Sequence, residues 1–125
     1  MRPEDQFQVY SDKADHYRKL AEYIKSHTYY DDGNLWGCDV ITALFYSFVL
    51  EVKKYLKLKY PNFEQKSHIE ISKFLREKDN NHGASRAYRS LEVVANNARY
   101  EVKNIDKKTR KKFYQELAKG MNSLK

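Results

Sequence analysis

The sequence has little of three residue types that shape many folds: one cysteine, two prolines and four glycines in 125 residues. The single cysteine, Cys38, excludes an internal disulfide and a cysteine metal cluster. So few prolines and glycines leave long uninterrupted stretches, which favours helices over sheets. A long apolar run is also missing, because the longest, over residues 40–50, falls well short of the roughly 20 residues that span a bilayer.

Several other signals are missing as well. The N-terminus, MRPEDQFQVY, is polar and acidic, without the basic-then-apolar layout of a secretory signal. The four histidines never stand at i, i+4, and no glycine-rich phosphate loop or nucleophile elbow occurs. We therefore predict a cytoplasmic protein with no membrane segment, no metal site and no cofactor. Its length fits one domain over residues 1–125.

Positive charge is in surplus, and it lies at the C-terminal end. The net charge is +7, and residues 102–125 contribute eight basic and two acidic side chains. Such a segment can bind phosphate backbones by releasing condensed counterions. A solvated helix face is the alternative, because lysine also keeps surfaces wet. The candidate binding residues in this segment are Lys107, Lys108, Arg110, Lys111 and Lys112.

Apolar spacing predicts a long helix near residues 7–24 and a second one after it. The first repeats apolar residues at alternating intervals of three and four, which makes one stripe on a helix: Phe7, Tyr10, Ala14, Tyr17, Ala21 and Ile24. The second begins between Trp36 and Asp39 and runs to Tyr60, because Pro61 cannot continue it without cost. Its first half is apolar nearly all round, which predicts a central place in a bundle or an oligomer interface.

Local signals define three more helices. A capping box over Ser67–Glu70 opens a helix that ends by Lys78. Residues 79–83, with the sequence DNNHG, are predicted to be a loop, and the next helix covers residues 84–101. Asp106 is a plausible cap for the last helix. Five helical segments with short links predict an all-α fold, an up-and-down antiparallel bundle of four to five helices.

Three motifs, in order and spacing, resemble small prokaryotic HEPN domains. Trp36 precedes DVITALFYSFVL, in which Asp39 and the Leu-Phe-Tyr ending at Tyr46 are similar to the family's second helix. The Ser-His pair in KSHIE, which contains His68, is similar to the start of its third helix. The stretch YRSLEVVANNARYE, residues 88–101, resembles its Tyr-x-x-Leu and Ala-Arg-Tyr signature. Together the motifs span about half of the chain.

This resemblance implies a HEPN-like bundle that forms a homodimer in a prokaryotic defence or toxin–antitoxin system. The family includes metal-independent ribonucleases and non-catalytic relatives that bind RNA or nucleotides. The nucleases carry an arginine and, four to six residues later, a histidine that transfers protons. Here Asn104 stands at the shortest spacing after Arg99, and asparagine cannot transfer protons. The resemblance therefore implies a degraded nuclease motif, in which Arg99 and Tyr100 are kept for binding.

Three functions stay open at this point. The first is binding of RNA or a nucleotide by the Arg99 region and the basic C-terminal segment. The second is RNA cleavage, because Arg76 is followed after five residues by His82, at a spacing that the nucleases use. The third is a protein-interaction subunit or inhibitor, with a partner encoded by a neighbouring gene. Its only support is the apolar second helix.

Other polar and aromatic residues belong to the predicted binding surface. Trp36 and Tyr46 are expected in the core or an interface, where tyrosines and tryptophans can also stack on bases. His68 follows a helix cap and is a candidate ligand contact.

Two charges stand close to apolar surface. Asp39 is expected to cap the second helix or to favour its positive end. Arg99 is expected to approach a carboxylate, first Asp39 and then Glu101 or Glu92, because a charge near apolar surface usually has a partner.

Overall fold

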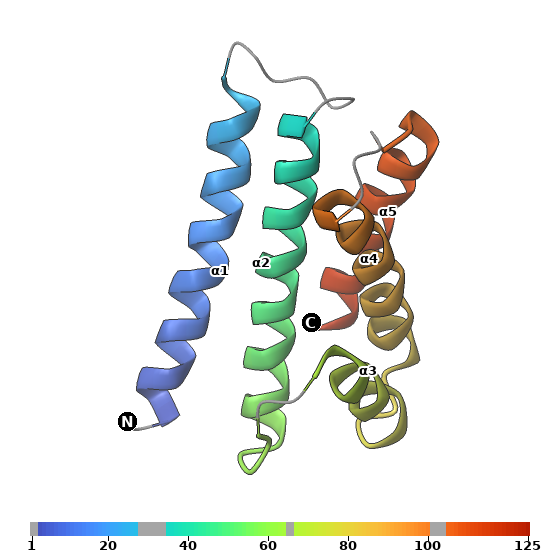
Figure 1. The fold of residues 1–125 in the computed structure, drawn as a ribbon. Helices are drawn as coiled ribbons and strands as arrows, with labels where there is room; N and C mark the ends of the chain where they lie inside the picture. The colour runs from blue at the N-terminus through green and yellow to red at the C-terminus, as the bar shows by residue number, and fades with distance from the viewer. Residues whose placement is uncertain (1–2, 28–34, 65–66, 101–104) are drawn as a thin grey trace.

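The computed structural model describes residues 3–27, 35–64, 67–100 and 105–125, and it is a bundle of helices (Figure 1). In chain order the helices are α1 (Pro3–Lys25), α2 (Leu35–Lys59), α3 (His68–Glu77), α4 (His82–Tyr100) and α5 (Lys107–Ser123). The described residues contain no strand. The predicted all-α bundle is therefore confirmed.

The long helix α2 lies at the centre of the bundle. Helix α1 runs beside it on one side, and α4 and α5 pack on the other side, with α3 next to the start of α4 (Figure 1). The main core contains Phe45 and Phe48 of α2, Tyr88 and Leu91 of α4, and Phe113 of α5, all essentially without solvent exposure. The apolar first half of α2 is thus central, as its sequence predicted.

Helix α1 packs on α2 through small side chains. Its predicted stripe faces α2, and Ala21 and Ile24 form a second apolar cluster with Val40 and Ala43. The hydroxyl of Ser47 on α2 donates a hydrogen bond of 2.9 Å to the carbonyl of Ala14. This bond satisfies a polar group that is buried between the two helices.

Two predicted helix caps are confirmed. Ser67 is the N-cap of α3, where its hydroxyl accepts the backbone N–H of Glu70 at 3.3 Å. Asp106 caps α5 by accepting the backbone N–H of Thr109 at 2.7 Å. The predicted cap at Asp39 is wrong, because α2 already begins at Leu35 and Asp39 lies exposed in its second turn.

The predicted loop over residues 79–83 is too long, because α4 begins at His82. The physical reason is that any of three neighbouring polar residues, Asp79, Asn80 and Asn81, could cap the helix, and the sequence does not show which one does. Asn81 accepts the backbone N–H of Ala84 at 3.0 Å through its side-chain oxygen, which stabilises the first turn of α4. Asn80 makes the tight connection with a φ of 57°, a left-handed conformation that asparagine tolerates.

Asp79, in the same short loop, joins the end of α3 to the end of α2. Its side chain is fully buried and accepts hydrogen bonds from Tyr55 at 2.7 Å, Lys59 at 2.9 Å and Tyr60 at 2.8 Å. Burial alone would raise the pKa of Asp79, but these hydrogen bonds outweigh it and hold the pKa below its ordinary value. The loop is therefore a structural joint with a satisfied charge.

Candidate nucleic-acid interface

Helices α3 and α4 pack closely because two serines face each other between them. The hydroxyl oxygens of Ser72 and Ser85 lie 3.1 Å apart, and the Ser85 hydroxyl also donates to the Ser72 carbonyl at 2.9 Å. Both serines are buried. Small side chains at the contact bring the helices together, so the longer side chains on either side project above the seam.

Two adjoining hollows lie along this seam, and we call them together the basic groove. The first, of about 360 Å³, is lined by Arg76, His82, Ser85, Arg86, Arg89 and Ser90. The second, of about 380 Å³, is lined by His68, Ile69, Ser72, Lys73, Arg76, Arg89, Glu92 and Val93. Arg76 and Arg89 line both hollows, so the two adjoin.

The basic groove carries three cations that no carboxylate of the described residues pairs with. Lys73, Arg86 and Arg89 are exposed and form no ion pair or hydrogen bond within the described part of the chain. Arg76 lies 3.3 Å from its neighbour Glu77, a weak surface pair. Among the residues that the structure describes, Glu92 is the one carboxylate that lines the groove. The surface is thus strongly electropositive, which favours anionic ligands.

His68 lies at the far end of the groove, where α4 fixes its orientation. Its Nδ1 lies 2.5 Å from the Tyr88 hydroxyl and 3.8 Å from a Glu92 oxygen, and its ring packs 5.5 Å from Phe45. Burial, followed by the nearby Glu92 carboxylate, raises the pKa of Tyr88, so this phenol stays protonated. It donates to Nδ1 when the imidazole is neutral. Nε2 makes no hydrogen bond within the described residues, and His68 lines the second hollow.

The structure brings together Arg76 and His82, the two residues at nuclease spacing. Both line the first hollow, although His82 opens a helix and does not lie in a loop. His82 Nε2 lies 3.0 Å from the side-chain oxygen of Asn80. His68, another predicted binding residue, lies in the second hollow.

Arg99 and Tyr46 form a contact in another part of the molecule. Arg99 donates a hydrogen bond to the Tyr46 hydroxyl, and its guanidinium lies 5.3 Å from the centre of the Tyr46 ring. Neither residue lines the basic groove. The expected approach of Arg99 to a carboxylate, first Asp39 and then Glu101 or Glu92, stays a prediction, and Glu101 lies outside the described residues. The side chains of Trp36 and Tyr100, and all of Asn104, also lie outside them.

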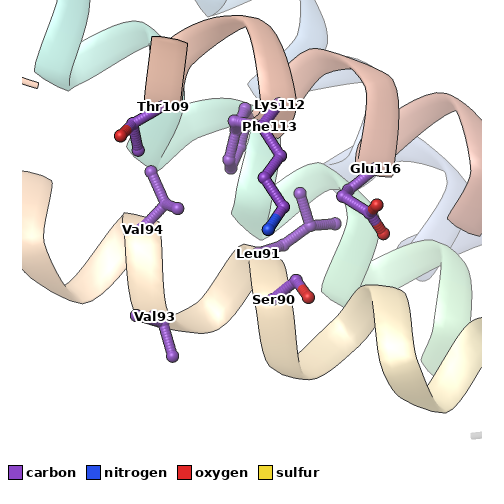
Figure 2. A pocket seen from close by; sticks show the side chains of 8 residues that line it. All are labelled: Ser90, Leu91, Val93, Val94, Thr109, Lys112, Phe113 and Glu116. Atoms are coloured by element: carbon purple, nitrogen blue, oxygen red, sulfur yellow. The ribbon is translucent and has the colours of Figure 1, made fainter. Parts of the chain in front are cut away.

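The basic residues of α5 lie outside the basic groove. Lys107, Lys108, Lys111 and Lys112 are exposed, and Arg110 donates to the backbone carbonyl of Ile105. Lys112 borders a third hollow, of about 330 Å³, between α4 and α5. Figure 2 shows the Lys112 side chain extending toward α4, while Val93 points away from the gap between the helices.

Sequence reasoning missed Lys73, Arg86 and Arg89 as site residues. A signal was present: Lys73 and Arg76 stand three residues apart on α3, and Arg86 and Arg89 do so on α4. Residues three apart share a helix face, and a short connection between the helices brings the two pairs to one seam.

Comparison with protein-family models, curated proteins and solved structures finds no match for this chain. Each helix within the described residues is too short or too polar to cross a membrane. In the same part of the chain, no three His, Cys, Asp or Glu side chains are grouped so that they could hold a metal ion.

Proposed function

We propose that this protein binds the phosphate groups of RNA or of a nucleotide in the basic groove. The observation that carries the proposal is the convergence of Lys73, Arg86 and Arg89 on one seam without partners in the described chain. Like charges held together on one seam repel one another, so their convergence favours an anionic ligand that relieves this repulsion. Arginine suits phosphate because its planar group can donate two parallel hydrogen bonds.

Salt-dependent binding of a labelled single-stranded oligoribonucleotide tests this proposal. The double variant Arg86→Ala/Arg89→Ala should bind at least about tenfold more weakly than the wild type. Each lost phosphate contact lowers the slope of log affinity against log salt by about 0.7 for a single strand, so the slope should fall by about 1.4.

A variant with the same loss of charge on α5 serves as the control. Lys107→Ala/Lys111→Ala removes two exposed cations that lie outside the basic groove and should change affinity less than about twofold. A larger loss in this variant would locate binding on α5 and contradict the groove. Competition by nucleoside monophosphates separates the two ligand sources: strong competition identifies a nucleotide, and weak competition identifies a longer strand.

RNA cleavage is the second candidate function, because Arg76 and His82 line the same hollow. A histidine there could transfer a proton at the ribose, and an arginine could stabilise the phosphate charge. Incubation of RNA with the protein in the presence of a chelator tests this candidate. Cleavage that His82→Ala abolishes would establish it, and RNA left intact by the wild type over long incubation would exclude it.

The wider setting is part of the same proposal. We infer a HEPN-like binding module that acts as a cytoplasmic homodimer in a prokaryotic defence or toxin–antitoxin system. Its support is the three motifs in the sequence together with an all-helical chain of five helices. Sedimentation equilibrium should give twice the 15.0 kDa of one chain, and a monomer at every concentration would contradict the dimer.

A further inference from the structure

The two ends of the basic groove differ in chemistry. The end near the α3–α4 loop is lined by Arg76, His82, Arg86, Arg89 and two serines, with no carboxylate among its described lining residues. The end near the start of α3 shares Arg76 and Arg89 and adds Lys73, but it also has Glu92 beside His68. Because of this carboxylate, a ligand with uniform negative charge suits the second end less well than the first.

The Glu92 end also exposes apolar surface. Ile69 is 77% exposed and Val93 is 60% exposed, and both border the second hollow. An uncharged, partly apolar group that carries N–H or O–H donors suits this end. It would cover the two aliphatic side chains and donate to the Glu92 carboxylate, which only accepts hydrogen bonds. The nucleoside part of a nucleotide has these properties, with ribose hydroxyls, base amino groups and apolar base faces.

The dimensions of the groove fit such a ligand. Arg86 and Val93 are seven residues apart on α4, which at 1.5 Å per residue is about 10 Å along the helix axis. Arg76 and Arg89 line both hollows. They would therefore contact the ligand where its phosphate joins the nucleoside. Nε2 of His68 is left for a hydrogen bond to the ligand, because the Tyr88 hydroxyl occupies Nδ1.

We infer that the basic groove binds a nucleotide unit in one direction, with a phosphate at Arg86 and the nucleoside between Glu92 and the Ile69–Val93 surface. This inference deepens the proposed function and rests on it. Glu92 is then the residue that distinguishes a nucleic-acid strand from a simple polyanion. Opposite responses to two probes follow from this assignment.

Isothermal titration with a short oligoribonucleotide and with inorganic polyphosphate tests the inference. Glu92→Gln keeps the size of the side chain and removes its charge. We expect it to weaken oligoribonucleotide binding about fivefold, because a charged acceptor is lost. Polyphosphate binding should stay unchanged or become tighter, because a repelling charge is lost. A change in the same direction and by the same factor for both probes would overturn the inference.

The apolar surface gives an independent second test. Ile69→Ser and Val93→Ser should each weaken oligoribonucleotide binding without affecting polyphosphate, and Leu58→Ser, 57% exposed and away from the groove, should affect neither. Unchanged oligoribonucleotide binding in both groove variants would also overturn the inference. If Arg86→Ala/Arg89→Ala weakens both probes while the Glu92 and apolar variants change nothing, the proposed function stands and only the binding direction fails. If the double arginine variant changes neither probe, the proposed function itself fails.

Discussion

The α3–α4 hairpin carries a buried, hydrogen-bonded charge at its loop and exposed charges along the basic groove. At the loop, the buried Asp79 carboxylate accepts hydrogen bonds from Tyr55 and Lys59 of α2 and from Tyr60, the residue that follows α2. A few residues away, Arg86 and Arg89 are exposed and have no partner within the described chain. The difference separates a charge that builds the fold from charges available to a ligand. Variants at the two places should therefore have separate effects on stability and on binding.

The largest effect on stability is expected at the loop. Asp79→Ala leaves the hydroxyls of Tyr55 and Tyr60 and the Lys59 ammonium without their shared acceptor. Losing three hydrogen bonds to a charged group should lower the free energy of unfolding by about 3 kcal/mol. Urea denaturation measures this change. Glu64→Ala, an exposed carboxylate next to the same region, should stay within about 0.5 kcal/mol; an equal loss in both variants would contradict a special role for Asp79.

The pH dependence of stability tests whether Asp79 is charged in the folded protein. The pKa of Asp79 is depressed in the folded state, so its contribution is present in full above the ordinary aspartate pKa of 3.8 and is lost as pH falls through the folded value. The difference in unfolding free energy between wild type and Asp79→Asn should therefore be constant at neutral pH and shrink below about pH 4. A difference that stays constant down to pH 2 would count against a charged, hydrogen-bonded Asp79.

A pair of glycine variants tests the helix packing that supports both the loop and the basic groove. A Cβ at Gly120 of α5 would lie 2.8 Å from the buried Phe48 ring and 2.9 Å from the Ala87 Cβ. Gly120→Ala should cost about 2 kcal/mol through overpacking. At Gly83 the Cβ would meet the Ser123 hydroxyl, the movable end of a side chain, so Gly83→Ala should be close to neutral. Thermal unfolding of both variants checks this contrast, which equal melting temperatures would contradict.

The smallest effect separates charge from geometry in the groove. Arg86→Lys/Arg89→Lys keeps both positive charges but loses the planar fork of donors. We expect oligoribonucleotide affinity to fall about threefold, with the salt slope unchanged, because the number of phosphate contacts is the same. Unfolding free energy should not change, since neither arginine has a protein partner within the described residues. A loss of stability here would place these arginines with the structural charges.

Much of the fold could be predicted because its signals are local. The stripe on α1, the cap at Ser67 and the cap at Asp106 each depend on residues within a few positions of one another. The start of α4 was harder to predict, because Asp79, Asn80 and Asn81 are all plausible cap residues. Contacts with α2 decide among them, since Asp79 is occupied by side chains some twenty residues earlier in the chain.

The candidate site could be predicted only in part. Arg76, His82 and His68 were selected from spacing and motifs, and the structure places all three in the basic groove. Lys73 and Arg89 were not selected, because each looks like an ordinary solvated charge until α3 packs on α4. The cluster of cations at the C-terminal end drew attention to α5, where the charges are exposed along a helix. Charge density along the sequence therefore did not indicate the groove between α3 and α4.

Chemical-shift mapping tests the central claim most directly. Isotope-labelled protein is titrated with a short oligoribonucleotide at low salt, and the backbone amide shifts are followed residue by residue. The basic groove predicts that the largest shifts fall on residues 68–76 and 82–93, and that added salt reverses them. Largest shifts on residues 107–112, or shifts spread evenly over the five helices, would contradict the groove as the binding site.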